Sequence, residues 1–380
     1  MKVAGRIGAL VFLWAGLPLA AADGPVFSGL FEVKAGGGMS DTGEALSGVD
    51  VYANLRLREQ ARENLTFYAA FNAQAAAGMF AVPQAGGGGA LFEAERLYLR
   101  WAEERWGLDA GLMPLHFGYG QVFAPSDFLI RKNPAVLDAR PRGVSGAAVY
   151  QYPHDAVKLT GFAVFPSDVR SGGWEDIHCG AAFEAHTARA SFQALYAYQT
   201  GTAPGGVDNG DGDGEGGGGV HFVGASVKID AGVGLLADGL YRIDRANRAA
   251  IDAEGLALSA GADYTFGKLY VLAEYLYNGN RSVSRQSAGG AFRNRAFVGA
   301  TLLCTVSDLT NVAAQGLWSV DDGSLLPSLV FSHDLAQGFT LSVSAQIPLD
   351  LGRDNDSPGE LGPETAGKRL SLTAGLRLRL

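Results

Sequence analysis

Apolar and polar residues alternate along almost the whole chain after residue 22, and this period of two constrains the fold more than any other feature. Residues 368–380 show it clearly, because apolar side chains occupy every second position: Leu370, Leu372, Ala374, Leu376, Leu378 and Leu380. A helix would distribute these leucines around its axis, whereas a strand places them on one face. The alternation therefore predicts an all-β fold.

About eighteen such segments can be counted, near residues 25–35, 48–58, 63–75, 91–102, 106–113, 143–152, 156–166, 176–186, 189–199, 219–229, 232–243, 254–266, 268–278, 294–306, 309–320, 324–333, 338–347 and 368–380. Their lengths are close to the roughly 9–11 residues that a tilted strand needs to cross a bilayer. Short connections at 60–62, 153–155, 187–188 and 267 alternate with long, Gly-rich ones at 36–47, 76–90, 114–142, 200–218, 279–293 and 348–367.

This alternation of loop lengths is typical of outer-membrane barrels. We therefore expect a transmembrane antiparallel up-and-down β-barrel of about 18 strands. The brief connection at 321–323 is an exception, because the alternation requires a long connection there. The alternative count is therefore about 16 strands.

The composition excludes several other classes of protein. Glycine contributes 54 residues, charged residues make up 18% and hydrophobic residues 47%. No apolar run after the N-terminus approaches the roughly 18 residues of a membrane helix, which excludes a helical transporter. With 30 basic against 39 acidic side chains, the chain lacks the basic excess of a protein that binds nucleic acid.

The first 22 residues are predicted to be a secretory signal peptide. Lys2 and Arg6 precede an apolar stretch at 7–17, and Ala20 and Ala22 form a small-residue cleavage site. The alternative is a buried N-terminal helix. The barrel would then occupy residues 23–380. Cys179 and Cys304 lie in phase with apolar neighbours, so we expect both to face lipid, with a single disulfide as the alternative.

The chain resembles Gram-negative outer-membrane porins, and its strand number is similar to that of substrate-specific and alginate-export channels. The resemblance rests on the signal peptide, the ladder of strands, a final strand running to the last residue, and a motif that comprises Gly118, Tyr119, Gly120, Phe123, Pro125, Asp127, Asn133, Pro134, Arg142 and Gly143. Porins usually end on an aromatic residue, whereas this chain ends at Leu380.

The resemblance implies a place in the cell outer membrane, surrounded by its lipid. It also implies that the barrel-assembly machinery recognises the C-terminal strand, that small hydrophilic solutes pass through the lumen, and that no cofactor is needed. Many porins are trimers, so an oligomer is compatible with it.

In porins the third outward loop folds into the lumen, and here that loop is 114–142. By this resemblance it would narrow the channel as a constriction loop, with aromatic side chains on the inner wall and charged ones at the opening: Phe117, Tyr119, Asp127, Arg131, Lys132, Asp138, Arg140 and Arg142. The alternative is an ordered outer cap that seals the mouth.

Basic side chains in the polar phase of four strands form a second candidate site. If the leucines face lipid, seven basic residues point into the lumen: Lys34, Arg56, Arg58, Arg96, Arg100, Arg377 and Arg379. Their strands become neighbours when the barrel closes, and such a wall would attract anions. Alternatively these residues pair with Glu59, Glu63, Glu103 and Glu104 to brace the turns.

No motif favours an enzyme. The six histidines lack metal-binding spacing, and no G-x-S-x-G sequence occurs. The acidic loop 208–215 could hold calcium, but it lacks the glutamate at the twelfth position and is better interpreted as a flexible loop. We therefore expect a channel for small solutes, with anions as the candidate class. The alternatives are a surface adhesin or structural barrel that binds partners through its long loops, and a secreted soluble β protein.

Overall fold

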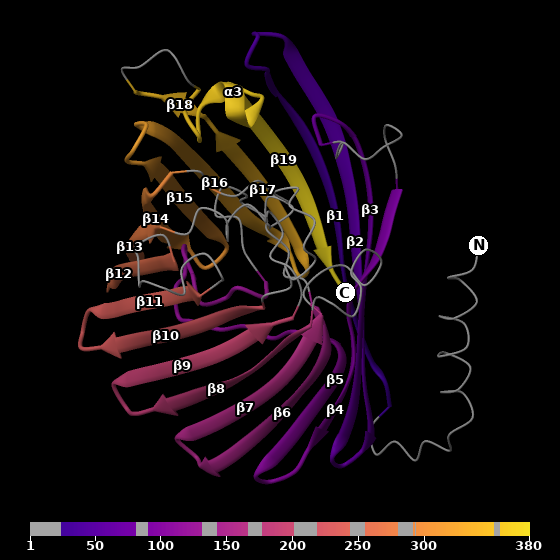
Figure 1. The fold of residues 1–380 in the computed structure, drawn as a ribbon. Coiled ribbons are helices and arrows are strands. Elements are labelled where there is room, and N and C mark those ends of the chain that lie inside the picture. Colours follow the sequence, from indigo (N-terminus) through magenta and orange to yellow (C-terminus); the bar gives the residue numbers. More distant parts are fainter. Residues whose placement is uncertain are drawn as a thin grey trace, which may run out of the picture.

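The computed structural model describes residues 24–80, 90–130, 143–165, 177–200, 219–243, 255–279, 292, 294–352 and 358–380. Eighteen antiparallel strands pair in sequence order and form a closed barrel (Figure 1). The first and last strands close it, with a register that runs from Leu30 opposite Arg379 to Met39 opposite Leu370. The predicted signal peptide, residues 1–22, lies outside the described residues.

The strands of the ring are β1 (Val26–Met39), β2 (Ala45–Arg62), β3 (Leu65–Gly78), β4 (Ala90–Ala102), β5 (Trp106–Met113), β6 (Val144–His154), β7 (Val157–Phe165), β8 (His178–His186), β9 (Ala190–Gln199), β10 (Val220–Asp230), β11 (Gly234–Ile243), β12 (Leu256–Phe266), β13 (Leu269–Asn278), β14 (Ala296–Ser307), β15 (Thr310–Ser319), β16 (Ser324–Ala336), β17 (Phe339–Gln346) and β19 (Leu370–Arg379). A two-residue strand, β18 (Leu349–Asp350), pairs with β16 beyond the end of β17. The prediction of about eighteen strands is confirmed, and the alternative of sixteen is wrong.

The connection between β15 and β16 explains why the count stays at eighteen. Residues 320–323 form a tight turn. Gly323 has a φ of 73°, in the left-handed region that glycine enters without a steric penalty. A short turn therefore stands at the end of the barrel where the other connections are mostly long.

The predicted long connection at 36–47 is wrong. Gly36, Gly37 and Gly38 belong to β1 and pair with β2 on one side and with β19 on the other. The turn itself occupies residues 40–44, where the hydroxyl of Ser40 accepts a hydrogen bond from the backbone N–H of Glu44 at 2.9 Å. Glycine weakens an isolated strand, but here each glycine is held by two neighbouring strands.

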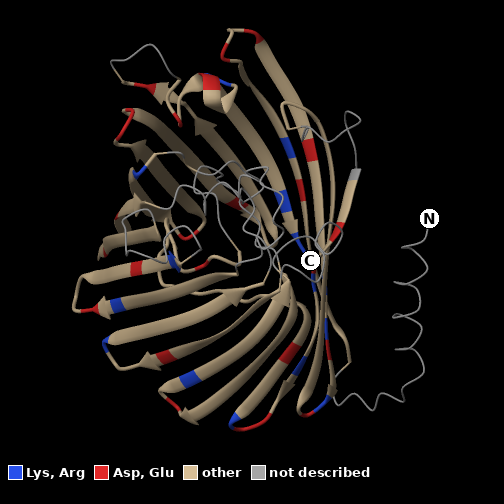
Figure 2. Cartoon of the chain, in the orientation of Figure 1, with Lys and Arg blue, Asp and Glu red and all other residues tan. Residues whose placement is uncertain are grey.

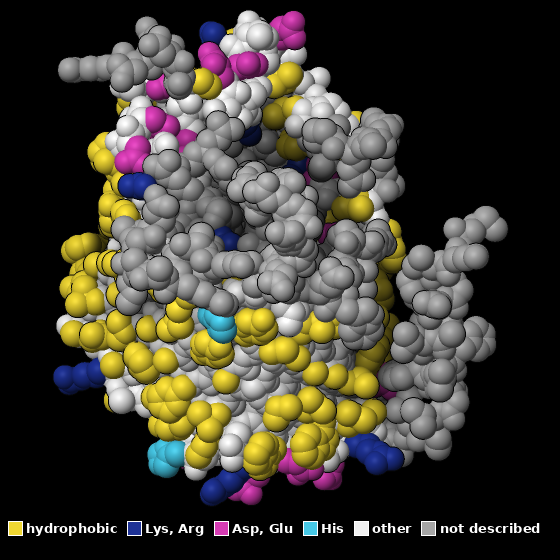
Figure 3. Space-filling model, in the orientation of Figure 1, with side chains coloured by type: hydrophobic (Ala, Val, Ile, Leu, Met, Phe, Trp, Pro, Cys, Tyr) yellow, Lys and Arg dark blue, Asp and Glu magenta, His cyan; other side chains and the backbone are white. Residues whose placement is uncertain are grey.

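The two faces of the wall differ as the alternation predicted. On β17, the Val343 side chain is 41% exposed on the outside, while its neighbours Ser342 and Ser344 point inward. Apolar side chains cover the outer wall on the face shown in Figure 3, and charged ones gather towards the ends. Cys179 and Cys304 are both free and lie in the outward phase, so the alternative of a disulfide is wrong.

Helix is rare in the described part of the chain. The short α3 (Pro363–Ala366) precedes β19, and Gly367 ends it in the left-handed conformation. No described helix has both the length and the apolar character needed to cross a membrane.

Because the outer face meets hydrocarbon, a charge placed there should destabilise the barrel more than the same charge inside. We expect Val343→Arg to reduce the free energy of unfolding by roughly 2–4 kcal/mol, the cost of an arginine near the bilayer midplane. Unfolding by urea in lipid vesicles measures it.

The neighbouring substitution Ser344→Arg is the matched control, since it adds the same side chain to the same strand on the inner face. It should cost less than about 1 kcal/mol. Equal losses in the two variants would contradict the assignment of the faces.

Candidate functional site

The segment 114–130, which follows β5, folds against the inner wall of β9–β13 (Figure 1). The backbone N–H of Gly118 donates to the Gln193 side chain, and that of Tyr119 donates to the Ser226 hydroxyl at 2.9 Å. Both acceptors belong to the inward phase of their strands and are buried. The segment therefore lies within the ring of strands.

Two buried carboxylates of the inner wall hold this segment. Glu274 on β13 accepts three backbone N–H bonds, from Gln121 at 2.8 Å, Val122 at 3.1 Å and Phe123 at 2.8 Å. Asp238 on β11 accepts the Ser126 N–H at 2.9 Å and its hydroxyl at 2.8 Å. Hydrogen bonds to ionised acceptors are stronger than neutral ones, so these contacts fix the path of the segment.

Gly118 shows how closely the segment approaches the wall. Its φ is 85°, a conformation that side-chain-bearing residues rarely adopt. A Cβ at this position would overlap the Asp238 carboxylate and the Ser126 hydroxyl. A glycine is required here for both reasons.

Apolar side chains fill the space between the segment and the wall. Phe117 and Phe128 stack with ring centroids 6.3 Å apart, and Phe128 also stacks on Phe222 of β10 at 4.8 Å. Phe123 packs in a second cluster with Leu276 and Leu361. The segment is thus anchored by packing and by hydrogen bonds together, and it occupies one side of the lumen.

The residues predicted for the constriction loop divide into two groups. Phe117 is buried against the wall, Tyr119 is half-buried, and Asp127 is buried within the segment, where it contacts the His116 ring at 3.1 Å. The remaining five lie outside the described residues: Arg131, Lys132, Asp138, Arg140 and Arg142.

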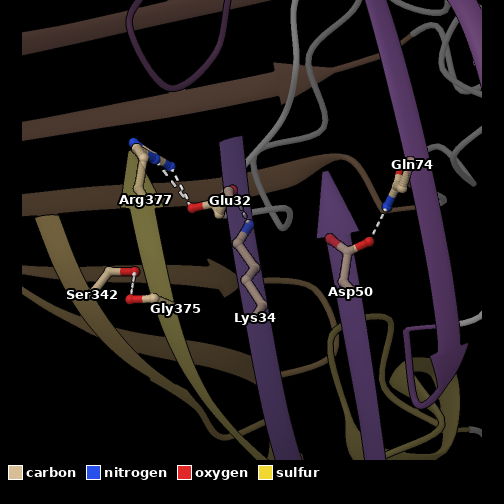
Figure 4. Close-up of polar contacts among 7 residues, drawn as sticks. All are labelled: Glu32, Lys34, Asp50, Gln74, Ser342, Gly375 and Arg377. Carbon is tan, nitrogen blue, oxygen red and sulfur yellow. Dashed lines mark hydrogen bonds and ion pairs between the residues drawn. The ribbon is translucent and has the colours of Figure 1, made fainter. Parts of the chain in front are cut away.

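The seven predicted basic residues lie in the inward phase of β1, β2, β4 and β19. Figure 2 shows basic and acidic positions close together along these strands. Figure 4 shows the arrangement at the seam of the barrel, where Lys34 and Arg377 both contact the Glu32 carboxylate. The Lys34 Nζ lies 3.1 Å from Glu32 and the Arg377 Nη2 lies 2.9 Å from it.

The cations and their partners differ in exposure. Arg100 makes a two-pronged ion pair with Asp109 at 2.7 and 2.8 Å; its side chain is 41% exposed and that of Asp109 1%. At the seam, Lys34 is 15% and Arg377 30% exposed, against 2% for Glu32. The carboxylates are therefore embedded in the wall, and the cationic groups cover them on the lumen side.

The other basic residues follow the same pattern with weaker contacts. Arg96 lies 3.6 Å from Glu95, whose side chain is buried. Arg58 lies over the Tyr68 ring at 5.6 Å. Arg56 is exposed and donates to the Asn54 side chain at 2.6 Å. Arg379, at the end of β19, is exposed.

The acidic partners suggested by the sequence are not the ones found. The ion pairs described for the basic wall involve Glu32, Glu95 and Asp109, rather than the glutamates at 59, 63, 103 and 104. Glu95 lies at a β-bulge between Ala94 and Arg96, whereas Glu32 and Asp109, like Asp238 and Glu274, are acidic residues in the inward phase of their strands. That phase was visible in the sequence, but the partner of each carboxylate depends on register and on the path of the segment.

No candidate metal centre appears among the described residues, where no three His, Cys, Asp or Glu side chains are close enough to hold an ion. The acidic loop 208–215 lies outside them. Two of the described histidines contact a carboxylate: His116 lies 3.1 Å from Asp127, and His186 lies 3.8 Å from Glu184.

No model of a protein family matches the sequence, and no curated protein is recognisably similar to it. Solved structures are similar in fold. OpdK of Pseudomonas aeruginosa, an outer membrane protein, is 8% identical with a TM-score of 0.59, over 95% of this chain and 100% of that one. OpdQ of the same organism is 12% identical with a TM-score of 0.57, over 94% and 99%.

A third similar structure is Wzi of Escherichia coli, an outer membrane protein involved in group 1 capsule assembly and a carbohydrate-binding β-barrel. It is 13% identical with a TM-score of 0.59, over 99% of this chain and 86% of that one. At such low identities the likeness establishes the fold, which is that of bacterial outer-membrane barrels.

The contacts of Glu274 predict that this carboxylate fixes the segment. Glu274→Gln replaces one acceptor oxygen by an N–H₂ group that faces backbone donors, so we expect a loss of about 1–3 kcal/mol in the free energy of unfolding. The amides of residues 121–123 should also exchange faster with deuterium.

Asp263→Asn is the matched control, because Asp263 contacts the same segment through one exposed bond of 3.3 Å to the Gln121 side chain. It should cost less than about 0.5 kcal/mol. Unchanged exchange at 121–123 in Glu274→Gln would mean that packing alone holds the segment.

Proposed function

We propose that this protein is an outer-membrane channel through which small hydrophilic solutes diffuse, with a preference for anions. The exposure difference along the basic wall supports it most directly. Basic groups are accessible from the lumen while their carboxylate partners are buried beneath them. A passing solute would therefore meet positive charge first. In a narrow lumen with low-dielectric walls, such a layer attracts anions.

The segment 114–130 supplies the second element of the proposal. It occupies the side of the lumen next to β9–β13, which is away from the basic wall on β19 and β1–β4. Solutes would pass between the segment and that wall. The loop 114–142 would thus set the width of the channel, and the cationic wall its charge preference.

The proposed function is diffusion through the lumen and involves no covalent step. An eighteen-stranded ring is wide enough for a water-filled lumen, whereas an eight-stranded one is filled by side chains. No cofactor is required by this mechanism.

Charge reversal at Arg56 tests the preference, because this exposed side chain bonds to the Asn54 amide oxygen rather than to a carboxylate. A charge about 8 Å from the solute path contributes roughly 0.5 kcal/mol in water, so reversing it changes the energy of an ion by about 1 kcal/mol. Because the energies of chloride and potassium change in opposite directions, their difference changes by about 2 kcal/mol, and we expect Arg56→Glu to reduce the chloride-to-potassium permeability ratio by up to about thirtyfold at low salt. Reversal potentials in planar bilayers under a salt gradient measure it.

Arg189→Glu is the matched control, since Arg189 lies in the turn between β8 and β9 and carries the same charge outside the basic wall. Its effect should be small. A wild-type channel that prefers cations would contradict the proposed preference.

Stable insertion without conductance would contradict the channel itself. It would favour the second candidate, a surface barrel that binds partners through its long loops. The likeness in fold to Wzi, a carbohydrate-binding barrel, supports this partner-binding barrel as the alternative to a channel.

A further inference from the structure

The inner wall of β14–β17 differs chemically from the basic wall beside it. Its inward side chains are mostly small or medium-sized groups that donate and accept hydrogen bonds, and β19 continues the pattern: Thr301, Asn311, Gln315, Ser328, Ser332, Ser342, Ser344, Gln346, Ser371 and Thr373. On these four strands, all of whose residues are described, Asp334 at the short-turn end is the single charged inward side chain. We call this set the hydroxyl wall.

The strand register arranges the hydroxyl wall in rows across the sheet. In one row Asn311 stands opposite Ser332, and Ser332 stands opposite Ser342. Side chains directly opposite each other have Cβ atoms about 4.5–5.5 Å apart. Neighbouring groups of a row are therefore spaced closely enough to contact adjacent hydroxyl groups of one small molecule.

The same row continues to the basic wall, with one glycine of β19 between them. Ser342 stands opposite Gly375, and Gly375 stands opposite Lys34 (Figure 4). A Cβ at Gly375 would lie 2.9 Å from the Ser342 hydroxyl and 3.2 Å from the Lys34 Cγ. The glycine thus allows the Ser342 hydroxyl and the Lys34 side chain to lie close together, so the hydroxyl wall adjoins the basic wall directly.

Several hydroxyls of the hydroxyl wall have no hydrogen-bond partner among the described residues. Ser332, Ser344 and Thr373 are half-buried, and their hydroxyls make no hydrogen bond to another described residue. Ser371 is also without such a bond although it is 7% exposed. The Ser342 hydroxyl has a long bond of 3.4 Å to the Gly375 carbonyl. Each of these hydroxyls can donate one hydrogen bond and accept others.

We infer that the solutes favoured by this channel are small organic anions that carry several hydroxyl groups, such as sugar acids. The inference rests on the proposed function and specifies its solute class. The basic wall would receive the carboxylate, and the hydroxyl wall would replace the water lost by the hydroxyl groups in the narrowed lumen. An alkyl carboxylate of equal carbon number could use the first wall but not the second.

Permeabilities of gluconate and hexanoate test the inference, because both are six-carbon monocarboxylates and gluconate is the bulkier. Reversal potentials with potassium gluconate on one side of a planar bilayer and potassium hexanoate on the other give their ratio. A channel that merely sieves by size would pass hexanoate better. We expect the wild-type protein to pass gluconate better.

The triple variant Ser332→Ala, Ser342→Ala and Ser344→Ala removes three hydroxyls and slightly widens the lumen. Widening by itself would raise the gluconate-to-hexanoate ratio, whereas loss of hydrogen bonds would lower it. We expect the ratio to fall about threefold or more. The chloride-to-potassium ratio should stay at its wild-type value, which also shows that the variant folds and conducts.

Ser145→Ala, on the outward phase of β6, is the matched control and should leave both ratios unchanged. An anion-selective wild type that passes hexanoate better, or a triple variant with an unchanged gluconate ratio, would overturn the inference and leave the proposed channel intact. A protein without conductance would overturn both.

Discussion

Every backbone N–H and C=O group of a strand that crosses a bilayer must find a partner within the protein, because hydrocarbon offers none. The pairing of β1 with β19 meets this requirement for the two strands that would otherwise be edges. Closure has a second effect, since it divides all side chains into an outer and an inner set. The outer set is apolar, as at Val343, and the inner set is free to carry charge and hydroxyl groups.

The inner surface combines three kinds of chemistry, each on its own part of the ring. Beneath the segment 114–130, buried carboxylates such as Glu274 bind backbone N–H groups, and aromatic rings pack the remaining space. On β19 and β1–β4, cations cover embedded carboxylates. On β14–β17 the lining carries a single charge, at Asp334, and is rich in hydroxyls. A lumen lined in this way is chemically asymmetric.

Much of this fold could be predicted from the sequence, because alternation is a local property and each strand carries it independently. The extended glycines 36–38 could not, since their conformation is imposed by strands from both ends of the chain. The inward phase of Lys34 and Arg100 was also predictable. Their partners were not: Arg100 meets Asp109 through local register, but Glu274 meets Gln121 across 153 positions of sequence.

The contact between Glu32 and Arg377 joins residues 345 positions apart. Before closure, these side chains stand on the two free edges of an unfinished sheet, and such edges are templates for wrong pairing with other chains. Opposite charges at matching heights favour the native register over one slipped by two residues. The same groups that line the lumen would thus align the two edges during folding, so a change at Arg377 bears on closure of the barrel as well as on the charge of its lumen.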